Sequence, residues 1–306
     1  MGKYIINRLF GLIPLLIAVS FLIFLFVHLI PGDPARLMAG KDATVHEVQA
    51  IRAELGLNKP FFEQYLMYMN DLLHGNLGYS LRSDVPVTEL FSERFIPSMV
   101  LSLWSIGWAV VFGVLIGVIS AVFRGKWPDY IGTMTAISGI SVPNFWLGLV
   151  MIQIFAVTFG VLPSGGIESL SSYILPSFAL GAGIMAMITR FTRSSLVQTL
   201  QDDFIRTARS RGLDEKTVVL GHALKNSLIT VLTIAGLQFG YLLGGSIVVE
   251  SVFSFPGMGR LLIDSIQFRD YPVVQSLLLI FSLEFILVNF LVDILYGFLN
   301  PKIRYK

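Results

Sequence analysis

The sequence contains no cysteine among its 306 residues, which excludes disulfide bonds, thiol nucleophiles and thiolate-bound metals. Charged residues are also scarce, at 14% of the chain. Hydrophobic residues make up 54%, and the mean hydropathy is +0.73. This composition excludes an ordinary soluble domain and is typical of a chain that lies in lipid.

Motifs for ATP and metal binding are missing as well. No G-x-x-x-x-G-K-[ST] phosphate loop occurs, because the three Gly-Lys pairs are followed by Tyr4, Asp42 and Trp127. The "HEVQA" segment begins like a zinc-protease helix but has Ala50 in place of the second histidine. We therefore expect no catalytic residue, no metal and no cofactor bound by this chain.

Long apolar runs predict an all-α integral membrane protein with six transmembrane helices, since roughly 20 helical residues cross a hydrocarbon layer. The predicted spans are 9–30, 100–123, 131–159, 173–189, 227–249 and 274–299. Pro143 is the expected site of a kink in the long third span.

The distribution of lysine and arginine predicts the orientation, because positively charged loops tend to stay in the cytoplasm. With the N-terminus inside, 14 of the 22 basic residues are cytoplasmic, and most of the others are spread over the long outer segment 31–97. Both termini are then cytoplasmic. We divide the chain into 1–97, an N-terminal span with an outer helical segment, and 98–306, the main transmembrane domain with a cytoplasmic loop at 190–226.

The outer segment 31–97 has helical signals of its own. Thr44 and Glu47 have the spacing of a capping box, and apolar residues follow at helical intervals. We expect these apolar faces to pack on the outer ends of the bundle. Arg260 and Arg269 near the outer mouth are equally well explained as attraction for carboxylates or as interfacial anchors.

Two acidic residues fall in the last span, where an ionisable side chain is a functional hypothesis by default. Glu284 and Asp293 are nine residues apart and therefore lie on opposite helix faces, which argues against a joint proton relay. For Asp293 a structural ion pair with a loop arginine is favoured over a transport role, whereas for Glu284 a structural and a transport role both stay open.

The fifth span carries glycines at intervals of four, namely Gly236, Gly240 and Gly244, with Gly245 beside them. Small residues at this spacing let another helix approach closely. These glycines are explained either by tight helix packing or by a pathway wall that must stay unobstructed. Both interpretations are compatible with a helix at a subunit interface.

The cytoplasmic segment "DDFIRTARSRGLDEKTVVLGHALKN" predicts a short helix, a turn at Gly212 and a second helix that begins at Asp214. Topology alone would account for its basic residues, but not for two capped helices or for the small residue Ala208 four before the glycine. A docking site for a cytoplasmic protein is the better interpretation, and nucleic-acid binding is not expected.

This segment resembles the loop motif of permease subunits of bacterial binding-protein-dependent ABC importers, in their peptide-transporter form. The resemblance covers essentially the whole chain. It includes "HLIPGDP", "LGGSIVVESVFSFPGMGRLLIDSI" around Glu250, "RDYPVVQ" and "NPKIRYK". Among these importers the chain is most similar to glutathione permeases, next to dipeptide permeases, and less to nickel permeases. A proton-coupled secondary transporter is the alternative of a different class.

The resemblance implies a type I ABC importer transmembrane domain that moves small peptides across the bacterial inner membrane by alternating access. Glutathione is the expected cargo. It implies a second homologous permease, two cytoplasmic ATPases that use ATP and Mg²⁺, and a periplasmic solute-binding protein as partners, with membrane lipid around the bundle. Carried over by position, the ATPase-coupling residues are Arg206, Thr207, Ala208, Gly212, His222 and Leu224. Packing or pathway residues are Gly236, Gly240, Gly244, Gly245, Glu250 and Glu284. The sequence departs from the general importer motif at Arg206, where glutamate is usual, and at Thr230, where proline is common.

Overall fold

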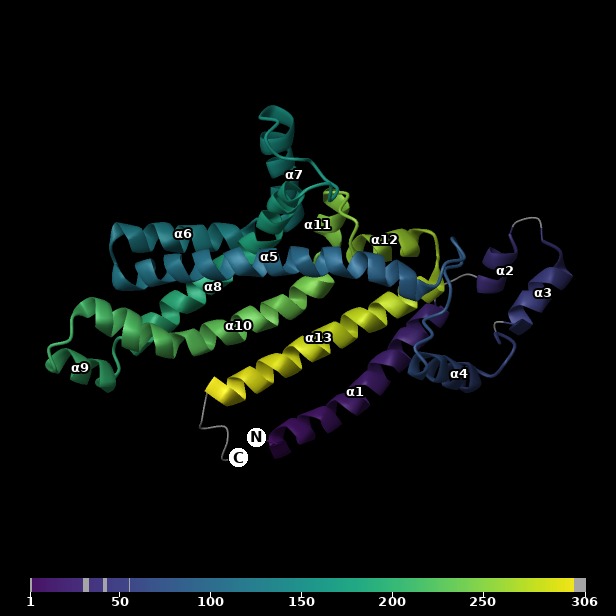
Figure 1. The fold of residues 1–306 in the computed structure, drawn as a ribbon, viewed down its shortest axis with the longest axis horizontal. Helices are drawn as coiled ribbons and strands as arrows, with labels where there is room; N and C mark the ends of the chain where they lie inside the picture. Colours follow the sequence, from purple (N-terminus) through teal and green to yellow (C-terminus); the bar gives the residue numbers. More distant parts are fainter. Residues whose placement is uncertain (1, 30–32, 41–42, 55, 300–306) are drawn as a thin grey trace.

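The computed structural model describes residues 2–29, 33–40, 43–54 and 56–299, and these residues are almost entirely helical (Figure 1). The only β pairing in this part of the chain is an isolated bridge between Tyr79 and Pro86. The elements are α1 (Gly2–Leu29), α2 (Pro34–Ala39), α3 (Val45–Glu54), α4 (Phe61–Leu73), α5 (Val87–Val122), α6 (Trp127–Ser141), α7 (Asn144–Met151), η1 (Ile152–Thr158), η2 (Leu170–Tyr173), α8 (Ile174–Thr199), α9 (Asp203–Ser210), η3 (Thr217–Ala223), α10 (Leu224–Gly245), α11 (Ile247–Val252), α12 (Met258–Gln267) and α13 (Tyr271–Leu299).

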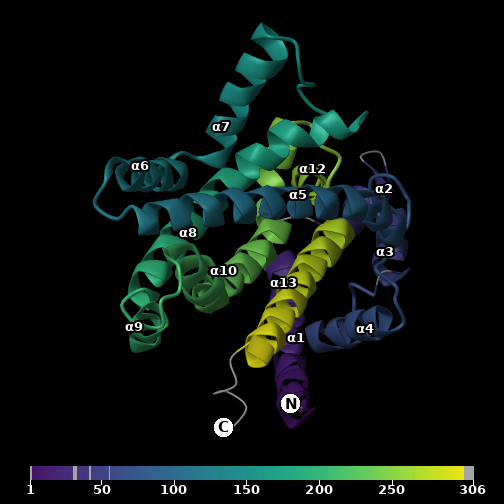
Figure 2. The same cartoon turned by 60° about the vertical axis from the view of Figure 1, so that its left-hand side comes forward.

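Five helical segments in the described residues are long and apolar enough to cross a membrane, and a bent pair makes up to six. The bent pair joins α6 to the helix formed by α7 and η1, at an angle of 101°. Pro143 stands at this break, which confirms the predicted position of the kink. Figure 2 shows α7 leaving the bundle steeply from the end of α6. The fourth predicted span was too short, because α8 continues ten residues further, to Thr199.

Small residues allow α5 and α8 to form the centre of the bundle. A β-carbon at Gly113 would lie 2.8 Å from the Ile188 side chain, and one at Gly117 would lie 2.6 Å from Thr192. Leu101 of α5 is completely buried in the same core. Because lipid is as apolar as leucine, such close contact, and not hydrophobic exclusion from water, stabilises helix pairs in a membrane.

The predicted boundary between residues 97 and 98 falls inside α5 and is therefore not a structural division. Pro97 lies within α5 and is buried, yet the helix runs without a break from Val87 to Val122. A helix that begins outside the predicted span and continues through it joins the outer segment rigidly to the bundle. The outer segment proper ends at residue 86, before α5 starts.

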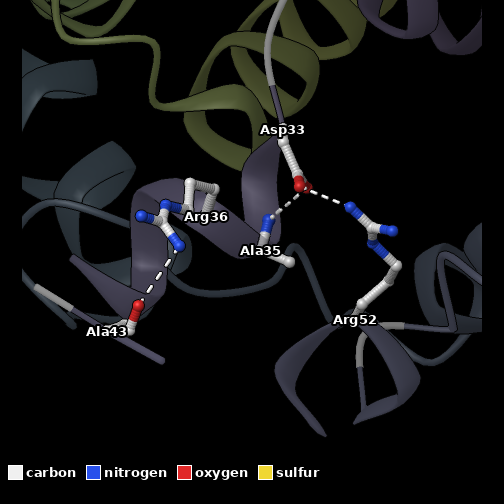
Figure 3. Close-up of polar contacts among 5 residues, drawn as sticks. All are labelled: Asp33, Ala35, Arg36, Ala43 and Arg52. Carbon is white, nitrogen blue, oxygen red and sulfur yellow. Dashed lines mark hydrogen bonds and ion pairs between the residues drawn. The ribbon is translucent and has the colours of Figure 1, made fainter. Parts of the chain in front are cut away.

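Polar contacts organise the outer segment. Asp33 caps α2 by accepting a hydrogen bond from the backbone N–H of Ala35 at 3.2 Å, and it also pairs with Arg52 of α3 (Figure 3). Arg36 donates to the carbonyl oxygen of Ala43 at 3.2 Å. Asp33, the second-to-last residue of the "HLIPGDP" motif, thus joins the two short helices α2 and α3.

The predicted capping box of α3 is present, with the Thr44 N–H donating to Glu47 Oε2 at 2.7 Å and the Glu47 N–H to Thr44 Oγ1 at 3.3 Å. The Thr44 N–H and the Thr44 hydroxyl, which donates to Glu47 Oε2 at 2.9 Å, hold the pKa of the Glu47 carboxyl below its usual value. The expected packing of the outer apolar faces is only partly realised. Tyr65 of α4 stacks edge-on against Phe21 of α1, but Phe62 and Leu66 are exposed.

Candidate functional site

The cytoplasmic-loop candidate lies at one end of the molecule, and α2 to α4 lie at the other (Figure 1). Its first helix, α9, is followed by a turn in which Gly212 has φ +78°. This left-handed conformation is the one predicted for the helix end, and glycine adopts it without steric cost. A second helical stretch, η3, then continues directly into α10, as predicted.

Hydrogen bonds fix both sides of the turn. The Thr217 N–H donates to Asp214 Oδ2 at 3.1 Å, so Asp214 begins the second helix. Hydrogen bonding from the Thr217 side chain, and then from this N–H, holds the pKa of Asp214 below its usual value. Arg209 Nη2 donates to Glu215 Oε1 at 2.6 Å, which likewise lowers the pKa of Glu215. Asp202 occupies the N-cap position of α9, but its side chain makes no capping hydrogen bond.

The loop rests on a small apolar cluster of its own, made by Ala121, Leu196, Ile205, Ala208, Val218, Val219 and Ala223. Ile205 and Ala208 are three residues apart, so they share one face of α9, and that face is turned into the chain. The predicted reason for the small size of Ala208, close approach by an ATPase, is therefore wrong. The residue is 8% exposed and is small because α9 packs against the ends of α5, α8 and η3.

The other predicted coupling residues differ in their exposure to solvent. Arg206 and Thr207 are exposed on the outer face of α9, where a partner protein can reach them. Leu224 is half-buried at the start of α10. His222 is exposed near the end of η3, and its role in coupling stays a prediction.

The glycines of α10 face another helix of the same chain. A β-carbon at Gly236 would overlap the Val292 side chain of α13, and one at Gly240 would lie 3.3 Å from Phe285. Close packing within the chain thus explains Gly236 and Gly240 without a subunit interface. Gly244 has open space around it and lines a groove between α1, α10 and α13. Gly245 is the last residue of α10.

Glu250 is completely buried and organises the outer end of the bundle. Its Oε1 accepts hydrogen bonds from Ser98 of α5 at 2.7 Å and from Ser246 at 2.8 Å. Its Oε2 accepts the backbone N–H of Arg260 at 3.0 Å, and Ser98 also accepts the Met258 N–H at 2.8 Å. The carboxylate therefore caps the N-terminus of α12 from another helix, where negative charge is favourable. Its position makes it a structural residue and gives no sign of contact with a pathway.

The two acidic residues of α13 behave differently, as their spacing predicts. Asp293 pairs with Arg8 of α1 at 3.0 Å, which confirms the ion pair, although the arginine belongs to a helix and not to a loop. This contact brings the beginning of α1 and the end of α13 together. Glu284 is half-buried, and within the described residues neither of its carboxylate oxygens has a hydrogen-bond partner.

Two further polar links were not anticipated from the sequence. Asp129 at the start of α6 accepts from Arg193 Nη2 of α8 at 2.8 Å and from the Gly125 N–H at 2.9 Å. Asp270, just before α13, accepts from Ser80 and from the Leu81 N–H, the latter at 3.0 Å. An acidic residue placed directly before or within the first turn of a helix is the only sequence signal for either link.

Comparison with known proteins places the chain in a family. The family model for the "binding-protein-dependent transport system inner membrane component" matches residues 113–305, and its N-terminal companion matches residues 1–102. The chain belongs to this family of inner-membrane permease components, a multi-pass class that acts with ATPase and substrate-binding partners. Residues 103–112, between the two matches, lie within α5.

Curated relatives narrow the comparison. The glutathione transport system permease proteins GsiC of Pectobacterium atrosepticum and Escherichia coli K12 are 54% and 52% identical over 306 residues, which is all of this chain and all of each relative. A solved inward-facing MetNI methionine ABC transporter is similar in fold, with a TM-score of 0.58 at 19% identity over 70% of this chain and 97% of that one. An amino acid ABC transporter crystallised with histidines has a TM-score of 0.56 at 18% identity, covering 68% and 94%. The fold is that of a type I ABC importer permease.

Proposed function

We propose that this permease imports small peptides, with glutathione as the cargo, by alternating access driven by ATP. The observation that supports it is an identity above 50% over the whole length of glutathione permeases. Dipeptides or oligopeptides are the second choice of cargo and nickel the third. The chain itself is taken to have no catalytic activity and to bind no cofactor.

The proposed assembly has four kinds of component. A second, homologous permease forms a heterodimer with this one, two ATPase subunits bind ATP and Mg²⁺ on the cytoplasmic side, and a solute-binding protein delivers cargo from the periplasm. In this arrangement both termini are cytoplasmic. The exposed face of α9 is the docking surface for an ATPase, with Gly212 setting the turn behind it.

Docking is tested with Arg206→Ala, because Arg206 is exposed and lies on the outer face of α9. The loss of this charged side chain should reduce the ATPase that co-purifies with the permease and lower uptake, while the permease pair stays intact. Arg124→Ala is the matched control, since it makes the same change at an exposed position between α5 and α6. Equal ATPase recovery and normal uptake in Arg206→Ala would contradict docking through α9.

Cargo is tested by uptake of labelled glutathione in a strain that lacks other routes for it, with unlabelled glutathione, dipeptides and nickel as competitors. We expect glutathione to compete best and uptake to disappear when the gene for this subunit is deleted. Uptake that persists after the deletion would refute the assignment of glutathione.

One observation favours a different class of transporter, the proton-coupled secondary transporters. Such a transporter requires an intramembrane carboxylate. Glu284 supplies one whose oxygens are unpaired among the described residues. In proteoliposomes, an ATP-driven permease should work without a proton gradient and should retain transport in Glu284→Gln. Dependence on the gradient, together with loss of transport in that variant, would favour the proton-coupled mechanism.

A further inference from the structure

A cavity of about 360 Å³ lies between α1, α4 and the beginning of α13, at the end of the molecule that carries the outer segment (Figure 1). Its volume is within the range of small-molecule binding pockets. Phe24 and Val27 of α1 and Leu57 and Leu81 of the outer segment supply apolar walls. The Phe24 ring stacks on Tyr68 at 5.6 Å between centroids, which joins α1 to α4 at this wall.

Three unpaired polar atoms from two elements line this one cavity. They are the hydroxyl of Tyr68 on α4, the hydroxyl of Tyr271 and the Nε2 of Gln275 on α13. Tyr271 is only 5% exposed, and none of the three atoms makes a hydrogen bond of normal geometry among the described residues. Buried polar atoms are almost always paired, so three unpaired ones around one space indicate that something else fills it.

The chemistry of these atoms favours a ligand with acceptor oxygens. The Gln275 Nε2 can only donate hydrogen bonds, and each tyrosine hydroxyl has one to donate. Burial raises the pKa of Tyr68 well above its usual range, and the nearby Gln275 side chain offsets this in part, so the phenol keeps its proton. A carboxylate, with two oxygens and about four lone-pair positions, matches this set of donors.

The opening of the cavity carries a negative charge, in contrast to the hydrogen-bond donors inside. Asp71 lines the cavity and is exposed, so it offers a negative charge to the side that faces water. His28 and Gln64 are also in the wall, but His28 Nε2 and Gln64 Oε1 are already paired with each other at 3.0 Å. A ligand held at both ends therefore needs a carboxylate inside and an ammonium group at the opening.

We propose that this cavity binds a zwitterionic molecule of short-peptide size, with its carboxylate at Tyr68, Tyr271 and Gln275 and its amino group at Asp71. In taking a peptide as the ligand, the inference rests on the proposed function and adds an outer-side site to it. An aminophospholipid head group carries an oxyanion and an ammonium group as well, so the experiment must separate the two sources.

The test uses the whole importer without its solute-binding protein, in nanodiscs of phosphatidylcholine, with glutathione binding measured by calorimetry. In the double variant Tyr68→Phe/Tyr271→Phe we expect binding to weaken tenfold or more, because two hydrogen bonds to a charged group are lost. The thermal stability of this variant should stay equal or rise, since removing an unpaired buried hydroxyl costs nothing.

Tyr65→Phe is the matched control. Tyr65 belongs to the same aromatic group on α4 but does not line the cavity, and its hydroxyl is paired with Ser20 at 2.9 Å. This variant should bind glutathione normally. Asp71→Asn should weaken the binding of glutathione but leave that of an N-acetylated analogue unchanged.

The site proposal is overturned if the double variant binds glutathione as tightly as the wild type, or if the wild-type importer binds none. It is also overturned if the only occupant is phosphatidylethanolamine, detected by mass spectrometry in nanodiscs that contain this lipid and lost in the double variant. Uptake separates this failure from that of the proposed function. If wild-type cells take up glutathione, only the site is refuted, whereas absent uptake refutes the cargo assignment itself.

Discussion

Replacement of Glu250 tests the interpretation of the outer end of the bundle most directly. The carboxylate is fully buried and accepts three hydrogen bonds, from the hydroxyls of Ser98 and Ser246 and from the backbone N–H of Arg260. Glu250→Ala leaves all three donors without an acceptor and opens a small cavity beside them. We therefore expect a large loss of stability that depends on no other subunit.

The magnitude follows from the number of donors. An unsatisfied buried donor costs about 1–3 kcal/mol, and because neighbouring losses are not additive, about 3–6 kcal/mol is expected in total. At roughly 2 °C per kcal/mol for a chain of this size, the melting temperature should fall by about 6–12 °C. The measurement is thermal unfolding of the purified permease in detergent.

Two milder variants sharpen this prediction. Glu250→Gln keeps the shape but replaces one acceptor oxygen with an N–H₂ group, so one of the three hydrogen bonds must rearrange, and about 1–2 kcal/mol should be lost. Ser246→Ala removes one donor together with its own need for an acceptor and should cost less still. If Glu250→Ala unfolds at the same temperature as Ser246→Ala, the carboxylate is not the centre of this network and the argument fails.

Three further predictions concern packing, pH and topology. Gly236→Val should destabilise the fold by about 1–3 kcal/mol through overlap with α13, whereas Gly244→Ala should be neutral, as thermal unfolding can show. Because the folded-state pKa of Asp214 is lowered, its stabilisation of the loop is present above the unfolded pKa of about 4 and is lost as the pH falls below it. Hydrogen-exchange protection of the Thr217 amide should follow this course and lose its pH dependence in Asp214→Asn. Since the chain has no cysteine, Ser83→Cys should react with impermeant reagents from the periplasmic side only, and labelling from the cytoplasmic side alone would invert the topology.

Local signals in the sequence were sufficient for the features that depend on neighbouring residues. The Thr44 capping box, the left-handed Gly212 and the break at Pro143 each depend on a few adjacent positions, and each is present as predicted. The spans could be predicted for the same reason, because the bilayer imposes a length and a composition on each helix separately.

Features that depend on distant residues could not be predicted in this way. Glu250 was assigned to packing or the pathway because its partner Ser98 lies 152 residues earlier, on another helix. The link between Asp270 and Ser80 spans 190 residues. No periodicity in one sequence carries such pairings, since they arise only when helices are brought together by the fold.

The interpretation of Ala208 failed for a different reason, because the sequence did contain the signal for its inward orientation. Ile205 and Ala208 stand three apart and so share a helix face, and a face with two apolar residues in an otherwise polar helix is expected to turn inward. The small size of Ala208 was assigned to an external partner, although the chain itself supplies the surface that requires it.

The inward face of α9 also explains how the loop is held against the bundle. Its residues pack into one buried cluster with Ala121 of α5, Leu196 of α8 and Val218 of η3, and η3 continues without a break into α10. Close-packed interiors are nearly incompressible, so a displacement of α9 has to move the ends of these three helices with it or break the cluster. The exposed side chains Arg206 and Thr207 thus belong to a rigid unit, and the contacts that make this unit rigid are all within this chain. A partner that binds only the exposed face can therefore act on three helices without touching them.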